Sequence, residues 1–189
     1  MADAPPAAPL LLASTSPQRR AILEQLGIPF DVVAPDYEET GDDPLEHAVG
    51  KARSIEAGEH PALGVDTIVR CAGVVLGKPA DATEAERMLE TLSGRTHEVV
   101  SGLSLRTPAW EEAHTATTRV TFRPLTPRDL AWYLASREWE SRAGAYAIQG
   151  RGGALAARID GDYLNVVGLP AALLVRLLAE RFSGVYGFG

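Results

Sequence analysis

Residues 62–77 read ALGVDTIVRCAGVVLG, and this stretch decides the fold class. Two apolar runs, ALGVDTIVR and GVVLG, are rich in Val, Ile and Leu, a composition typical of buried strands. They are joined around Ala72 and Gly73, which leaves room only for a tight connection. Parallel strands need a long crossover, so these two strands must pair as neighbours in an antiparallel sense. Within a chain that otherwise alternates helices and strands, this pairing predicts an α/β fold with a mixed, twisted sheet and flanking helices.

The rest of the chain supplies the alternation. Apolar runs predict further strands at LLLA, FDVVA, HEVVSGLSL and ATTRVTF, and Asp160 with Gly161 suggests a hairpin turn after LAARI. Helical periodicity and end signals predict helices at 18–26, 44–58, 83–92, 126–135 and 170–182. Thr126 and Asp129 resemble a capping box at the start of the fourth helix. We expect one folded domain over residues 9–183, a disordered tail over 1–8 and a flexible tail over 184–189.

Bulk composition excludes several classes of protein. The 189 residues carry a net charge of −7, whereas general binders of nucleic acid or anionic membranes rely on a basic field. The single cysteine cannot form an internal disulfide. The N-terminal MADAPPAAP lacks the cationic region of a signal peptide. We therefore expect a cytoplasmic protein without nucleic-acid or membrane partners.

The stretch LASTSPQRR at residues 12–20 points to an anionic ligand. Ser16 and Pro17 are typical of a helix start, where the backbone carries partial positive charge. Arg19 and Arg20 lie in that first turn, where they repel the helix dipole. An anion bound there relieves the repulsion. Without such a ligand, removal of Arg19 should be neutral or slightly stabilising.

Three further side chains are candidates for chemistry. Asp66 interrupts an apolar strand, so it stays charged only beside a metal, a cation or several donors; a salt-bridged strand end is the alternative. Lys51 lies in register with Ala48 and Ala52 on the inward face of its helix, and a lysine whose stem is buried while its ammonium reaches water is the alternative. Lys78 follows Gly77 and by itself indicates no more than a surface turn.

An acidic loop and one amide complete the set. The loop PDYEETGDDP contains Glu39 and has enough carboxylates to supply an oxygen ligand to Mg²⁺, although most of them are expected to be solvated. Gln149 can pair with a nucleobase edge or bond to backbone. GVVLGK is one residue short of a P-loop, and the four histidines lack zinc-ligand spacing. Cations for a polyphosphate, acids for a metal and an amide for a base together suit nucleotide hydrolysis.

Eight motifs occur in the order found in the Maf family of nucleoside triphosphate pyrophosphatases, from Leu11 to Leu178. They are LASTSPQRRAIL, EET, GKA, GVDTIV, LGKP, LSGRTHEV, AGAYAIQG and GDYLNVVGLP. The resemblance implies a mixed α/β fold with two lobes around a central cleft, similar to the inosine-triphosphate pyrophosphatases. It also implies cleavage between the α and β phosphates, which yields a nucleoside monophosphate and pyrophosphate, with Mg²⁺ or Mn²⁺ as cofactor.

The resemblance also assigns roles to residues. It implies that Asp66 is the catalytic proton acceptor and, with Glu39, a metal ligand. Substrate-binding positions carry over onto Ser14, Arg19, Lys51, Lys78 and Gln149. The motif Y-x-I-Q-G resembles the branch that acts on dTTP and UTP. Gln18 replaces an arginine at a position linked to substrate choice, so we expect base specificity to depend on Gln18, Thr67 and Gln149.

The sequence thus predicts an enzyme that hydrolyses nucleoside triphosphates, with dTTP and UTP or modified pyrimidine nucleotides as substrates. Its role would be to remove surplus or modified nucleotides from the pool. A nucleotide-binding regulator of cell division and septum formation is the alternative, since inhibition of septum formation gave the family its name. The expected partners are the triphosphate and, as one option, a second copy of the chain in a homodimer.

Overall fold

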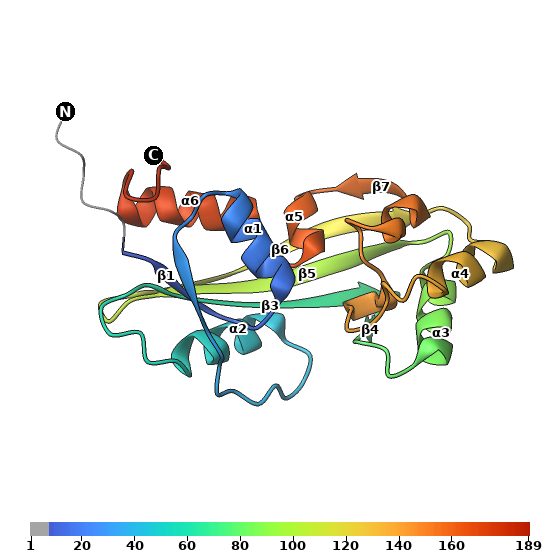
Figure 1. Ribbon diagram of the computed structural model, residues 1–189, viewed down its shortest axis with the longest axis horizontal. Helices are drawn as coiled ribbons and strands as arrows, with labels where there is room; N and C mark the ends of the chain where they lie inside the picture. The colour runs from blue at the N-terminus through green and yellow to red at the C-terminus, as the bar shows by residue number, and fades with distance from the viewer. Residues whose placement is uncertain (1–7) are drawn as a thin grey trace. The chain divides into compact units, whose positions relative to one another are not determined.

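The computed structural model describes residues 8–189, whose strands form one mixed sheet (Figure 1). The strands are β1 (Leu10–Ala13), β2 (Phe30–Val33), β3 (Ala62–Cys71), β4 (Val74–Leu76), β5 (Thr96–Arg106), β6 (Glu111–Phe122) and β7 (Ala156–Asp160). Their order is β2-β1-β3-β5-β6-β7, and β4 pairs with β3. Strand β1 is parallel to β2 and to β3, whereas β3–β4 and β6–β7 are antiparallel. The predicted mixed sheet is confirmed.

The hairpin that suggested this fold class has a two-residue turn. Ala72 and Gly73 both adopt positive φ angles, 50° and 81°. This backbone matches the right-handed twist of the two flanking strands, which is why such turns favour hairpins. The antiparallel pairing of Cys71 with Val74 and of Val69 with Leu76 follows directly.

Helices connect the strands, and their ends mostly follow the sequence signals. They are α1 (Pro17–Gln25), α2 (Pro44–Arg53), α3 (Ala82–Leu92), α4 (Pro127–Leu134), α5 (Tyr163–Val167) and α6 (Ala171–Phe182), with 3₁₀ turns η1 (Ala143–Ala145) and η2 (Arg151–Leu155). The capping box of α4 is confirmed, because Thr126 and Asp129 exchange both bonds. Helix α2 was predicted to reach Gly58 but ends at Arg53; the Ser54 hydroxyl binds the Lys51 carbonyl there, in competition with the backbone.

The hairpin predicted at Asp160 and Gly161 is wrong. Gly161 has a φ of 126° and ends β7, and the next residues turn into α5 instead of a strand. Asp162 starts that helix, because its side chain accepts a hydrogen bond of 2.8 Å from the backbone N–H of Leu164. An Asp that follows Gly can serve either a turn or a helix start, and the sequence pattern did not distinguish them.

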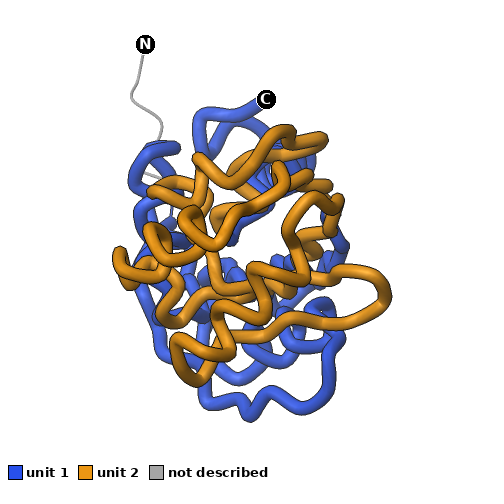
Figure 2. Tube along the Cα trace, turned by 90° about the vertical axis from the view of Figure 1, so that its right-hand side faces the viewer, with its two compact units in different colours: residues 1–66, 102–116, 168–189 blue, residues 67–101, 117–167 orange. Residues whose placement is uncertain are grey.

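The chain divides into two compact units (Figure 2). The first contains the described residues up to Asp66 together with 102–116 and 168–189; the second contains 67–101 and 117–167. The second unit has a core that includes Leu89, Phe122 and Tyr133. The division agrees with the two lobes that the family resemblance implied, and the cleft between them stays a prediction.

Helix α2 lies against the sheet of the first unit through two glycines. A Cβ on Gly64 of β3 would overlap the carbonyl oxygen of Ala48, and one on Gly102 of β5 would overlap that of Pro44. Only glycine allows the helix backbone to approach this closely. In Figure 1, α1 and α6 lie on the opposite face of these strands.

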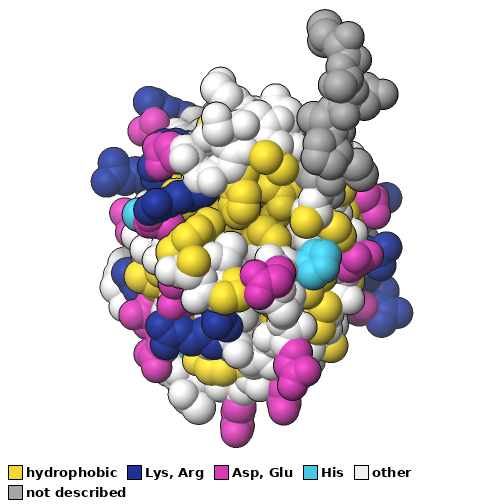
Figure 3. All heavy atoms as spheres, turned by 90° about the vertical axis from the view of Figure 1, so that its left-hand side faces the viewer, with side chains coloured by type: hydrophobic (Ala, Val, Ile, Leu, Met, Phe, Trp, Pro, Cys, Tyr) yellow, Lys and Arg dark blue, Asp and Glu magenta, His cyan; other side chains and the backbone are white. Residues whose placement is uncertain are grey.

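The ends of the chain and the surface complete the description. Residues 1–7 of the expected N-terminal tail lie outside the described residues, while the C-terminal segment includes the buried Tyr186, whose hydroxyl donates to the carbonyl of Ala8 at 2.8 Å. On the face in Figure 3, Lys and Arg side chains occur in small groups beside Asp and Glu. In the part of the chain that the structure describes, no helix is long and apolar enough to cross a bilayer.

Candidate active site

The candidate site lies at β1, where successive connections of the chain lead to strands on opposite sides. From β1 the chain passes through α1 to β2 on one side, and from β2 it returns through α2 to β3 on the other. Ligands in open α/β sheets bind outside the carboxyl ends of the strands at such a point. Ser14 follows the last residue of β1, and Asp66 lies two residues beyond Gly64, the partner of Ala13 in β3.

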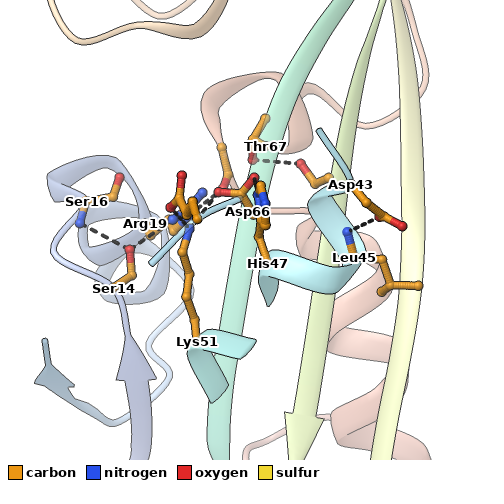
Figure 4. A network of polar contacts seen from close by, with 12 residues as sticks. Ser14, Ser16, Arg19, Asp43, Leu45, His47, Lys51, Asp66 and Thr67 are labelled. Carbon is orange, nitrogen blue, oxygen red and sulfur yellow. Dashed lines mark hydrogen bonds and ion pairs between the residues drawn. The ribbon is translucent and has the colours of Figure 1, made fainter. Parts of the chain in front are cut away.

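Asp66 faces α2 because of the alternation along β3. Gly64 contacts α2, and residues two apart on a strand share a face. The Asp66 side chain is therefore buried, and its Oδ1 accepts a hydrogen bond of 2.6 Å from Nζ of Lys51 (Figure 4). Lys51 is only 6% exposed, which confirms its predicted place on the inward face of the helix. The alternative of a lysine that reaches water is wrong.

Lys51 also joins Asp66 to the acidic loop. Its ammonium forms a second ion pair with Oε1 of Glu39, whose side chain is about half exposed. Burial raises the pKa of Asp66, but the charge and hydrogen bond of Lys51, the charge of Arg19 and the hydrogen bond of His47 outweigh it, so the pKa is lowered. The cluster thus holds Asp66 as a carboxylate.

Arg19 has structural partners that the sequence did not reveal. Its Nε donates to the carbonyl of Gly168 at 3.0 Å, and its Nη1 donates to Oγ of Ser14 at 2.9 Å. Burial lowers the pKa of Arg19, and the charges of Asp66 and Glu39 act in the opposite direction. These bonds and charges offset the repulsion by the helix dipole, so they argue against the expectation that removal of Arg19 is neutral or stabilising.

The hydroxyls before α1 form a small network beside Arg19. Oγ of Ser14 accepts from the backbone N–H of Ser16 at 3.2 Å as well as from Arg19. Ser16 occupies the N-cap position, but its hydroxyl donates to Oε1 of Gln18 at 3.1 Å and makes no capping bond within the described residues. The Gln18 carbonyl oxygen is therefore occupied in this arrangement.

His47 belongs to the cluster, although the sequence did not single it out. It is 4% exposed, and its Nδ1 lies 3.3 Å from Oδ2 of Asp66. Its Nε2 lies 3.1 Å from the carbonyl oxygen of Thr40, the residue after Glu39. Burial lowers the pKa of His47. The contacts with Thr40 and Asp66 and the charges of Asp66 and Glu39 raise it by more than burial lowers it, so the pKa of His47 lies above its ordinary value.

The donor atoms of this cluster fit a divalent cation. Glu39, His47 and Asp66 each offer one ligand atom, and these atoms lie within 4.8 Å of one another. Carboxylate oxygens are the ligands that Mg²⁺ and Mn²⁺ prefer, and an imidazole nitrogen is compatible with Mn²⁺. A bound cation competes with the ammonium of Lys51 for the oxygens of Glu39 and Asp66.

The remaining predicted residues lie in the second unit. Lys78 is exposed just after β4, and Gln149 is exposed in the turn between η1 and η2. That turn leads into η2, which contains Gly152 and Gly153. Thr67 follows Asp66 on β3, and its hydroxyl is hydrogen-bonded to that of Ser101 at 2.9 Å.

Comparison with known proteins identifies the family. The model of the family described as Maf-like protein matches residues 9–181. This chain belongs to the Maf-like protein family. It is 46% identical to the dTTP/UTP pyrophosphatase of Symbiobacterium thermophilum over 90% of this chain and 93% of the relative. It is 43% identical to the enzyme of that name from Deinococcus radiodurans, with 95% of each covered, and 47% identical to that from Moorella thermoacetica, with 94% and 97% covered.

A solved structure gives a weaker match to this Maf-like protein. The structure of the Staphylococcus aureus Ham1 protein aligns with 60% of this chain and 71% of its own, with a TM-score of 0.44 and 18% identity. Both values are too low to add to the family assignment.

Within this Maf-like chain, the structure thus brings together Ser14, Arg19, Glu39, Lys51 and Asp66. His47 was missed because the search among the histidines looked only for zinc-ligand spacing. The available signal was its position four residues before Lys51, which puts both side chains on one face of α2.

Proposed function

We propose that this Maf-like protein hydrolyses dTTP and UTP to the nucleoside monophosphate and pyrophosphate. The observation that carries the proposal is the cluster of two carboxylates and two cations, Glu39, Asp66, Arg19 and Lys51, just beyond the carboxyl end of β1, where Asp66 lies on the neighbouring strand β3. The proposal is also supported by similar members of the family, which are named dTTP/UTP pyrophosphatase.

The cations and hydroxyls near α1 bind the triphosphate. Arg19 and Ser14 lie at the N-terminal end of α1, where backbone N–H groups add partial positive charge. Lys51 contributes an ammonium from the opposite helix. A phosphate competes with Glu39 and Asp66 for these cations, so substrate binding loosens the ion pairs of the empty protein. Lys78 supplies a further cation to the phosphates.

Asp66 takes the proton of the attacking water. In the empty protein its pKa is lowered by Lys51 and Arg19, which makes it a weak base. When the triphosphate draws these cations away, the carboxylate loses its stabilising charges and its basicity increases. Substrate binding therefore activates the base in the same step that positions the phosphates.

Glu39 and Asp66 hold Mg²⁺ or Mn²⁺. A divalent cation bound there would neutralise part of the charge on the phosphates and polarise the bond that breaks. The residues themselves keep two tasks: the ion pair of Glu39 with Lys51 connects the acidic loop to α2, and Asp66 accepts the proton of the attacking water.

Base recognition falls to the amides. Gln149 offers one donor and one acceptor, which match O4 and N3–H of uracil or thymine. Gln18 has its carbonyl oxygen occupied by Ser16 and so presents its NH₂ group. Thr67, beside Asp66, adds a hydroxyl that is shared with Ser101. These three side chains together favour a pyrimidine.

The alternative, a nucleotide-binding regulator of septum formation, is not favoured, because the similar proteins from Symbiobacterium thermophilum, Deinococcus radiodurans and Moorella thermoacetica are named for the pyrophosphatase activity. The homodimer and the cytoplasmic location stay predictions. Size-exclusion chromatography with light scattering tests the first, and fluorescence microscopy of a tagged chain tests the second.

A substrate screen tests the proposal. Purified protein with Mg²⁺ or Mn²⁺ is given dTTP, UTP, CTP, GTP and ATP, and pyrophosphate and orthophosphate are measured separately. We expect pyrophosphate release with the highest kcat/KM for dTTP and UTP. A preference for a purine, or orthophosphate as the main product, contradicts the proposal.

A further inference from the structure

His47 connects two segments that carry metal-binding carboxylates. One ring nitrogen contacts Oδ2 of Asp66 on β3 (Figure 4). The other contacts the backbone carbonyl of Thr40 in the acidic loop. A carboxylate and a carbonyl oxygen only accept hydrogen bonds, and an imidazole donates from one nitrogen when neutral and from both when protonated. The ring is buried on α2, which fixes the direction of each ring nitrogen toward its oxygen partner.

Helix α2 thereby holds both oxygens of Asp66. Lys51 donates to Oδ1, and Nδ1 of His47 lies 3.3 Å from Oδ2; the two side chains extend from successive turns of the same helix. With a polar neighbour at each oxygen, the carboxylate plane cannot rotate freely. Each oxygen keeps a second lone pair for another ligand.

The acidic loop depends on the same helix for its position. Residues 34–43 contain neither helix nor strand, and Glu39 lies within them. The ring of Tyr37 lies so close to Gly50 of α2 that a Cβ there would overlap it, and it also lies 6.1 Å from the His47 ring. The bond from His47 to Thr40 therefore holds the backbone next to Glu39 where the loop already contacts α2.

We propose that His47 is a positioning residue, which holds the carboxylates of Asp66 and Glu39 at the separation required to bind one divalent cation. The proposal rests on the proposed function for the role of that cation. The proposal can be tested without turnover, because it concerns the affinity of the substrate-free protein for a metal ion. Removal of a residue that contacts a metal ligand without binding the metal typically lowers metal affinity about 10–100-fold.

Three substitutions separate the two bonds. His47→Leu removes both ring nitrogens and keeps an apolar side chain of similar bulk. His47→Asn places an amide NH₂ near the position of Nδ1, so it can keep the bond to Asp66. His47→Gln places one near the position of Nε2, so it can keep the bond to Thr40. His60→Leu is the matched control, because His60 is exposed and contacts only Pro9 among the bonds described for it.

The primary readout is the dissociation constant for Mn²⁺ alone, measured from the electron paramagnetic resonance signal of free Mn²⁺. We expect His47→Leu to weaken Mn²⁺ binding about 10-fold or more, and His47→Asn and His47→Gln to weaken it less. His60→Leu should bind Mn²⁺ as the unchanged protein does. In turnover assays, kcat should fall in His47→Leu more than KM for dTTP rises, because Arg19 and Ser14 are unchanged.

Several results overturn the proposal. It fails if His47→Leu binds Mn²⁺ as tightly as the unchanged protein, if the unchanged protein binds no Mn²⁺, or if Asn and Gln weaken binding as much as Leu. Should His47→Leu not fold, the Asn and Gln variants decide, and both must then bind Mn²⁺ more weakly than the unchanged protein. Failure of the proposed function is a separate result, since a protein that releases no pyrophosphate can still bind Mn²⁺ in a His47-dependent way.

Discussion

Replacement of Lys51 by methionine removes the cation that lies between two carboxylates. Methionine keeps the buried apolar stem, so the change isolates the ammonium group. Lys51 and Asp66 are 6% and 8% exposed, and the bond from Nζ to Oδ1 is 2.6 Å long. Loss of one partner from a buried ion pair typically costs about 3–5 kcal/mol. Arg19 and His47 still stabilise Asp66, so we expect the lower end, about 3 kcal/mol in the free energy of unfolding at neutral pH.

The pH dependence of this loss provides a second check. In the unchanged protein the pKa of Asp66 is lowered, so its contribution to stability is present above the ordinary aspartate pKa and is lost as the pH falls through the lowered value. In Lys51→Met, burial acts with less opposition, so the pKa of Asp66 moves upward and the carboxyl takes up a proton at higher pH. The difference in stability between the two proteins should therefore shrink as the pH falls.

Urea unfolding of both proteins at about pH 7.5 and about pH 4.5 measures this difference. Arg53→Met is the control, because it removes an exposed cation from the same helix and its pair with Glu111. We expect a much smaller loss for the control, since exposed pairs contribute little. The reasoning is refuted if Lys51→Met loses no more stability than Arg53→Met, or if its loss is the same at both pH values.

Three other predictions follow from the same structure. Arg19→Ala should lower the free energy of unfolding of the empty protein by about 1–3 kcal/mol through loss of its bonds to Ser14 and Gly168, and an unchanged melting temperature would contradict this. Burial lowers the pKa of His97 to about 4. The free energy of unfolding should therefore decrease by up to about 3 kcal/mol as the pH falls from about 6.5 to about 4. Urea unfolding should show this pH dependence in the unchanged protein and not in His97→Gln. Gln149→Ala should reduce the preference for UTP over GTP in kcat/KM, because the amide that matches the pyrimidine edge is lost; an unchanged or increased preference argues against this role.

Local patterns in the sequence were sufficient for most of the sheet. The two apolar runs within 62–77 indicated both strands and their tight connection, because turn residues and β-branched residues act over short distances. The inward position of Lys51 followed from helical periodicity alone. The wrong hairpin after Asp160 arose where two short-range interpretations of Asp and Gly competed, and the bond from Asp162 to Leu164 decided between them.

Contacts between distant segments were beyond such patterns. Arg19 binds the carbonyl of Gly168, 149 residues away in the chain, so no local signal could show that its charge has a structural partner. The role of Gly64 was also hidden, because it depends on which helix lies against the strand. His47 illustrates the intermediate case: its spacing from Lys51 was visible, but the carbonyl of Thr40 that it binds was not.

The most direct test of the account is pyrophosphate release from dTTP by the unchanged protein and by Asp66→Asn, with Mg²⁺ present and with orthophosphate measured in parallel. Asparagine keeps the shape of the side chain but cannot accept a proton, and a general base contributes about 10²–10⁴-fold to rate. We predict pyrophosphate as the product of the unchanged protein and a fall in kcat of at least about 100-fold in the variant. Orthophosphate as the only product, or an Asp66→Asn variant that retains most of the activity, would contradict the account.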